Sequence, residues 1–297
     1  MRRSAVLLLV TLVLFASLPT GAQDDDAEAV VMNALAQLSE LPGYHFEYFL
    51  RMSTILSDAE GVVLSTYTRT SAEGDALANG DNFTEFTLVS GENRDDANTI
   101  GNPRLRVDRT VLNGESFLNF RIRDTVYEEM FEIQPGWQSY EALIAAATSL
   151  TDQTVLNNIN SMALPSTLFD QIDLITSITE LEPETVSDVE LRVFELRLDA
   201  PALLIRRNPQ FESDLEQVLI TLRMIAESDL TANYQLSIGV EDGRLYYATL
   251  EESSTIPYLT AKIEGALPYD IASSTTISLY ISDHGETVEI EPVVFSD

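Results

Sequence analysis

The sequence predicts an α+β fold in which a long, curved antiparallel sheet, a half-barrel, wraps around a few apolar helices. Runs with a hydrophobic period of two occupy much of residues 44–133 and 186–291. Turn sequences separate these runs, and segments with a helical period stand before them and between the two groups. One sheet that curves around its own helices would bury both sets of apolar faces.

The first 22 residues have the order of a secretory signal peptide. Two arginines follow Met1, and an apolar run from Ala5 to Ala16 is too short to span a bilayer. Small residues precede Gln23, where we expect cleavage. The sequence therefore predicts a signal peptide over residues 1–22 and a single domain over 23–297, in a periplasm-like space or secreted.

The composition is strongly acidic and contains no cysteine. The chain has 17 basic and 48 acidic residues, and without the two arginines of the signal segment its net charge is −33. Nucleic acid is excluded as a partner, because binding a polyanion needs clustered lysine and arginine. The charge favours a soluble monomer, and no later segment is apolar over the length of a membrane span. The missing cysteine excludes disulfides, thiolate metal sites and a lipid anchor.

Helical spacing of apolar residues predicts a first helix over residues 29–41, which ends at Pro42-Gly43. The period then changes to two, which predicts an antiparallel meander. Its expected strands cover residues 44–53, 62–70, 83–89, 105–112, 116–122 and 126–133. Asn113-Gly114 gives the clearest two-residue hairpin signal among their connections.

A helical interruption is expected over about residues 135–180. It would contain helices over 137–150, 152–162 and 166–179, and the third is so apolar that it must be largely covered. A further helix is expected over 209–226, capped by Asn208 with Pro209 at its first position. Strands are expected over residues 186–198, 232–240, 244–250, 258–263, 275–282 and 287–291.

The sequence shows no constellation of catalytic residues. His45 and His284 are the only histidines, and neither has partners at the spacing of a metal site or a catalytic triad. The glycines are isolated turn formers without a phosphate-binding loop. We therefore expect a protein that is not an enzyme and needs no metal or cofactor. A hydrolase with two carboxylates and no visible motif remains an alternative, because acidic residues are abundant.

The apolar helices over 166–179 and 209–226 indicate either a thick core or a cavity for an apolar ligand. On the second interpretation, these helices bind a lipid or another amphiphile. The predicted ligand-binding residues are Leu168, Phe169, Ile172, Ile175, Phe211, Leu215, Val218 and Leu222.

Two segments carry a resemblance to a known family. Residues 238–246, IGVEDGRLY, and residues 279–292, LYISDHGETVEIEP, look like the carboxy-terminal strands of LppX/LprG-type envelope lipoproteins and, more distantly, of LolA/LolB-like lipoprotein carriers. The resemblance covers nearly the whole mature chain. It implies a half-barrel with an apolar cavity for acyl chains and no catalytic residues. This chain lacks the family's lipid-attachment cysteine, which favours a free carrier or a secreted binding protein.

Two functions of different classes follow. The first is a non-enzymatic carrier of lipids or other amphiphiles. The second is an envelope sensor or assembly module that binds a protein partner through its acidic surface, and salt would weaken that binding. A retained amphiphile would distinguish the carrier from the sensor, whose interior would hold none.

Overall fold

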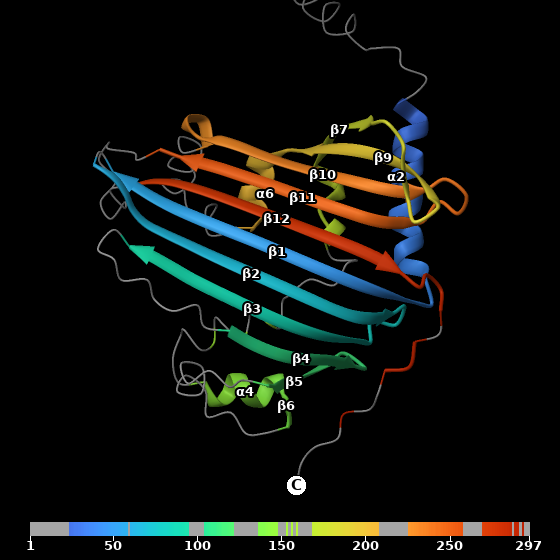
Figure 1. Cartoon of the computed structure of the whole chain (residues 1–297), viewed down its shortest axis with the longest axis horizontal. Coiled ribbons are helices and arrows are strands. Elements are labelled where there is room, and N and C mark those ends of the chain that lie inside the picture. The colour runs from blue at the N-terminus through green and yellow to red at the C-terminus, as the bar shows by residue number, and fades with distance from the viewer. Residues whose placement is uncertain are drawn as a thin grey trace, which may run out of the picture.

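The fold is a large, open antiparallel sheet (Figure 1). The computed structural model describes residues 24–58, 60–94, 104–121, 136–147, 153, 156, 159, 168–207, 225–257, 269–286, 288–290 and 293. Within these residues, 12 strands form one sheet in the order β6-β5-β4-β3-β2-β1-β12-β11-β10-β9-β7, and β8 pairs with β9. The first six strands are β1 (Gly43–Asp58), β2 (Gly61–Leu77), β3 (Asn82–Arg94), β4 (Arg104–Leu112), β5 (Glu115–Phe120) and β6 (Trp137–Ser139). The others are β7 (Ile175–Glu180), β8 (Glu184–Val186), β9 (Val189–Leu198), β10 (Asp229–Gly239), β11 (Leu245–Ile256) and β12 (Asp270–Ser282).

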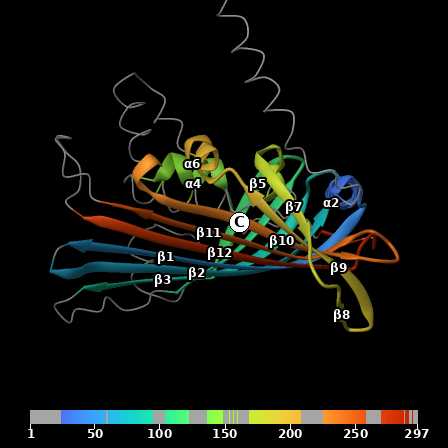
Figure 2. The same ribbon diagram turned by 90° about the horizontal axis from the view of Figure 1, so that it is seen from above.

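The helices lie on one face of this sheet, which we call the inner face (Figure 2). Those whose bounds lie within the described residues are α2 (Asp24–Glu40), α4 (Tyr140–Ala146) and α6 (Ala200–Arg207), and a 3₁₀ turn, η2 (Ile172–Leu174), precedes β7. The architecture matches the expected half-barrel. The described chain is mostly β, so the α+β class is corrected: the helices are few and mostly short.

The core lies between the inner face and the helices. On β1, Tyr44, Phe46 and Tyr48 are buried, whereas Glu47 and Phe49 are exposed on the opposite, outer face. From α2, the residues that enter the same core are Val31, Ala34 and Leu38. Each large side chain buried in this way stabilises the fold by about 1.5–3 kcal/mol. The period-two pattern of β1 and the helical pattern of α2 are thus two faces of one core.

The first and last long strands pair at the centre of the sheet. β1 runs antiparallel to β12, with Tyr48 opposite Leu279, and it pairs with β2 on its other side. The predicted hairpin at Asn113-Gly114 joins β4 to β5. Both turn residues have positive φ, 52° and 82°, as a two-residue hairpin of this type requires.

The helix predicted over residues 166–179 is wrong. Its second half is strand β7, which pairs with β9 so that Ile178 lies opposite Leu196. The run is rich in β-branched residues, which favour strands, and its short apolar stretch fits either period. Available pairing with β9 decides in favour of the strand.

Two other expectations are corrected, and some lie outside the described residues. The helix expected over 137–150 begins only at Tyr140, after strand β6, where Ser139 caps it by accepting a hydrogen bond from Ala142 N. The final strand expected over 287–291 is absent at residues 288–290. Just before these residues the chain turns at Gly285, whose N–H donates to the Gly43 oxygen at 2.8 Å. The expected strands over 126–133 and 258–263 lie outside the described residues.

Candidate functional site: a cavity beneath α6

Helix α6 starts from a defined cap. The Ala202 N–H donates to Oδ1 of Asp199 at 3.0 Å, and the Asp199 N–H donates to the Leu174 oxygen at 2.9 Å. The cap satisfies a helix N–H that has no partner within the helix. Leu203, one turn later, is 3% exposed and belongs to the core. This arrangement holds the apolar side of α6 against the sheet.

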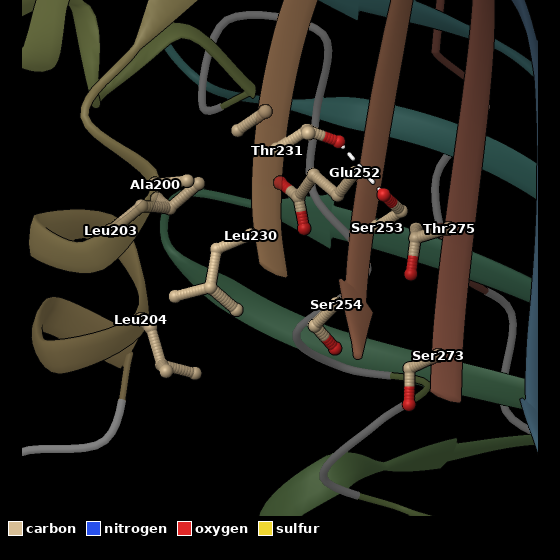
Figure 3. A pocket seen from close by; sticks show the side chains of 11 residues that line it. Ala200, Leu203, Leu204, Leu230, Thr231, Glu252, Ser253, Ser254, Ser273 and Thr275 are labelled. Carbon is tan, nitrogen blue, oxygen red and sulfur yellow. Dashed lines mark hydrogen bonds between the residues drawn. The ribbon is translucent and has the colours of Figure 1, made fainter. Parts of the chain in front are cut away.

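A cavity of about 150 Å³ lies between α6 and strands β10, β11 and β12 (Figure 3). Its lining residues are Ala200, Leu203, Leu204, Leu230, Thr231, Ala232, Glu252, Ser253, Ser254, Ser273 and Thr275. The side chains from α6 are apolar, and Leu230 joins them from β10. The side chains from β11 and β12 are hydroxyls and one carboxylate. The lining is therefore amphipathic.

The polar wall belongs to a wider band of hydroxyls on the inner face. The cross-strand register places Ser254 opposite Ser273, Ser273 opposite Thr54, and Thr54 opposite Thr66. We call Ser254, Ser273, Thr54 and Thr66 the hydroxyl band. Oγ1 of Thr54 and Oγ of Ser273 are 3.3 Å apart, within hydrogen-bond distance. The band crosses four adjacent strands at one level of the sheet.

The inner face changes character along the strands. Tyr234, Leu250 and Ile277 lie side by side on β10, β11 and β12 and are buried, at 9% exposure or less. Two residues further along β11 and β12 stand Glu252 and Thr275, which are half-buried. The hydroxyl band follows after two more residues. An apolar surface thus passes into a polar one within a short stretch of strand.

The volume of the cavity limits what it can hold. About 150 Å³ is enough for a benzene-sized group, whereas complete ligand sites have about 300–1,000 Å³. The cavity therefore accommodates one part of an amphiphile, such as a head group with its first methylenes.

The predicted site residues that the structure describes lie beside the core and not around this cavity. Phe169 is 9% exposed and packs on Tyr234, with ring centroids 5.7 Å apart. The Tyr234 hydroxyl donates to the Leu168 oxygen at 2.5 Å. Leu168 and Ile175 pack partly buried against the core, and Ile172 is half-buried in η2. The other predicted residues, Phe211, Leu215, Val218 and Leu222, lie outside the described residues.

Sequence reasoning missed α6 and the polar wall. A signal for α6 was present, because Asp199-Ala200-Pro201 combines a capping residue with a proline in the first helical turn. A signal for Glu252 was present as well. On β11 it continues the alternation of Ala248 and Leu250, so a strand extended past residue 250 places its side chain on the inner face.

The histidines take part in local hydrogen bonds. Nδ1 of His45 is 2.9 Å from Oδ1 of Asp75 across the β1–β2 pair. Nε2 of His284 is 2.7 Å from the Leu245 oxygen, and its ring packs on Tyr246. Across the described part of the chain, no group of three or more histidine, aspartate or glutamate side chains is placed to hold a metal ion. None of the helices in the described ranges has both the length and the apolar character to cross a membrane.

Similarity to known proteins is found only at the level of solved structures. No family model matches the chain, and no curated protein matches its sequence. The Mycobacterium tuberculosis lipoprotein LppX is similar over 91% of this chain and 100% of its own, with a TM-score of 0.40 and 12% identity. LprF from Mycobacterium bovis is similar over 92% and 99%, with a TM-score of 0.40 and 10% identity. A putative outer membrane lipoprotein-sorting domain from Vibrio parahaemolyticus is similar over 88% and 92%, with a TM-score of 0.23 and 11% identity. At such TM-scores, the function of this chain has to rest on its own residues.

Proposed function

We propose that the protein is a non-enzymatic, extracytoplasmic carrier or binding protein for lipids or other amphiphiles. The observation that carries this proposal is the cavity beneath α6. One side of the cavity is lined by leucines, and the other is lined by hydroxyl groups and a carboxylate. A ligand with an apolar chain and a polar end matches such a lining. The signal-like first 22 residues support a location outside the cytoplasm.

The affinity would come mainly from the apolar part of the ligand. Each methylene removed from water contributes about 0.8 kcal/mol, so the methylenes that the leucine side of the cavity covers add affinity without directional contacts. The polar end would lie at the hydroxyl band, where its hydrogen bonds replace those to water. Contacts to the predicted residues Leu168, Phe169, Ile172, Ile175, Phe211, Leu215, Val218 and Leu222 are part of this proposal.

Native mass spectrometry of the mature protein tests the proposal. The protein is purified without detergent from its own host and measured before and after organic extraction. We expect a mass excess that extraction removes. A bare mass before extraction would contradict the proposal.

A pair of variants then locates the ligand. Leu204→Trp fills the cavity beneath α6, so the retained mass should fall. Val186→Trp adds the same side chain at a position in β8 that is 53% exposed and should change nothing. Circular dichroism serves to check that both variants are folded. Equal retention by both variants would place the ligand elsewhere.

A second candidate function is supported by the outer face. The register places Glu47 opposite Glu73 and Glu73 opposite Glu85, and the next residue of this row, beyond Glu47, is the exposed Tyr280. Like charges directly opposite each other destabilise a sheet, and a binding role would account for this row. We propose as the alternative that the row binds a basic protein partner. Crosslinking in cells should then recover a partner with the native chain and lose it with the double variant Glu47→Gln/Glu73→Gln.

A further inference from the structure

We infer that the cavity beneath α6 selects amphiphiles with a cationic, hydrogen-bond-donating head group, such as an alkylammonium, over those with a carboxylate or phosphate. Glu252 is the residue that makes the selection. The inference rests on the proposed carrier function and specifies the class of ligand that the same site takes.

The position of Glu252 follows from the strand register. It lies opposite Ala232 on β10 and Thr275 on β12, and Ala232 is 3% exposed on the inner face. Its neighbour Glu251 points to the outer face and is exposed. The Glu252 side chain is a lining group of the cavity and extends from β11 toward Leu230 (Figure 3). Its Oε1 atom is buried.

The described lining residues other than Glu252 carry no formal charge. Among the described residues that line the cavity there is no lysine, arginine or histidine. The hydroxyls of Ser254, Ser273 and Thr275 both donate and accept, so they suit a charged or a neutral head group equally. Among the described lining residues, the only formal charge is therefore negative.

A partly buried carboxylate acts more strongly on a neighbouring charge than an exposed one, because less water screens it. An ammonium group in the cavity would gain a charge-assisted hydrogen bond to Glu252. A ligand carboxylate or phosphate would meet a like charge instead. The leucines from α6 and β10 would take the first methylenes of either ligand, so the difference in affinity comes from the head group.

Three ligands of equal chain length test the inference: dodecylammonium and laurate, each below its micellar concentration, and dodecanol below its solubility limit. Their dissociation constants are measured by displacement of a fluorescent fatty-alcohol probe from the delipidated mature protein. We expect dodecylammonium to bind at least about tenfold more tightly than laurate, the size of effect that one hydrogen bond to a charged group gives. Glu252→Gln should reduce this preference by about tenfold.

Glu251→Gln is the matched control. It removes the same charge from the adjacent residue of the same strand but on the outer face. The mature chain carries a net charge of −33, so any cation is attracted at long range, and both variants weaken that attraction equally. Only the difference between the two variants reports the position of the carboxylate in the cavity.

The outcomes separate the inference from the function on which it rests. Equal loss of preference in both variants, or tight binding of all three ligands without preference, would overturn the inference and leave the carrier intact. Binding of none of the three by a folded protein would contradict the carrier as well. A preference for laurate would also overturn the inference.

Discussion

Arg206 of α6 and Asp173 of η2 form an ion pair through two parallel hydrogen bonds. Nη1 and Nη2 of Arg206 donate to Oδ1 and Oδ2 of Asp173 at 2.7 and 2.6 Å. The hydrogen bond from Arg206 lowers the pKa of the Asp173 carboxyl. The pair joins the last turn of α6, the helix that covers the cavity, to the turn before β7.

Breaking this pair should loosen α6. Because the pKa of Asp173 is lowered in the folded state, its stabilisation is present above the unfolded value of about 3.9 and is lost as the pH falls through the folded value. We expect faster hydrogen exchange of the α6 amides in Asp173→Asn than in the native chain at neutral pH. In acid, where Asp173 is protonated, the two proteins should exchange alike. Glu184→Gln, an exposed substitution in β8, is the control. Identical exchange at neutral pH would show that the pair does not hold the helix.

Arg109 is a buried cation on the inner face of β4. It is 8% exposed, its Nη1 donates to Oδ1 of Asn82 at a long 3.4 Å, and its Nε has no hydrogen-bond partner among the described residues. Burial lowers the pKa of its guanidinium. A buried charge that no described carboxylate neutralises is costly, so Arg109→Met should leave the free energy of unfolding unchanged or raise it by about 1–3 kcal/mol in urea denaturation.

The control for this substitution is Arg106→Met. It removes an exposed ion pair with Glu85, with 2.6 Å between nitrogen and oxygen, and should change stability by less than about 1 kcal/mol. A loss of several kcal/mol in Arg109→Met alone would indicate that Arg109 has a counter-ion or a ligand.

The contribution of Asp108 to the free energy of unfolding should decrease as the pH rises. Its side chain is fully buried beside Arg121, and desolvation by burial raises the pKa of its carboxyl despite that neighbour. A raised folded-state pKa contributes stability below the unfolded value, and this contribution is lost as the pH rises through the folded value. Asp108→Asn should therefore flatten the fall in urea stability as the pH rises above the ordinary aspartate value of about 3.9. An unchanged pH profile in the variant would contradict the raised pKa.

The sequence predicted the elements whose period is unambiguous. In β1, buried and exposed residues alternate from Tyr44 to Phe49, and α2 repeats apolar residues at helical spacing. The segment with Ile175 and Ile178 fits both periods, so only its pairing with β9 distinguishes strand from helix. That pairing joins segments that are separate in sequence, so the local pattern of apolar residues does not predict it.

The cavity was less accessible to prediction than the fold. Its lining comes from α6 and from strands β10 to β12, which are brought together by the pairing of β10 with β11 and of β11 with β12. Apolar character alone favours Phe169 as a ligand-binding residue, but in the structure it packs against Tyr234. The hydroxyls that make the inner face amphipathic, such as Ser254 and Ser273, look in the sequence like ordinary polar strand positions.

Tyr48 should be among the last tyrosines to ionise. It is 6% exposed on the inner face of β1, and its neighbours on the adjacent strands are Ala72 and Leu279. Burial raises the pKa of its phenol to about 12. Because the folded value is raised, the stabilisation is complete below the ordinary value of about 10 and is lost as the pH rises through about 12.

Alkaline titration followed by phenolate absorbance checks this expectation. Tyr48→Phe should remove a step near pH 12, because the charged form of Tyr48 is the one that burial disfavours. The variant should also resist alkaline unfolding better, because its folded state no longer has to bury a phenol that ionises. Tyr280→Phe removes a phenol that is 48% exposed on the outer face and should leave the step near pH 12 in place. If Tyr48→Phe lowered the absorbance only at ordinary tyrosine pKa values, the inner face at β1 would be open to water, and the core between α2 and the sheet would have to be reconsidered.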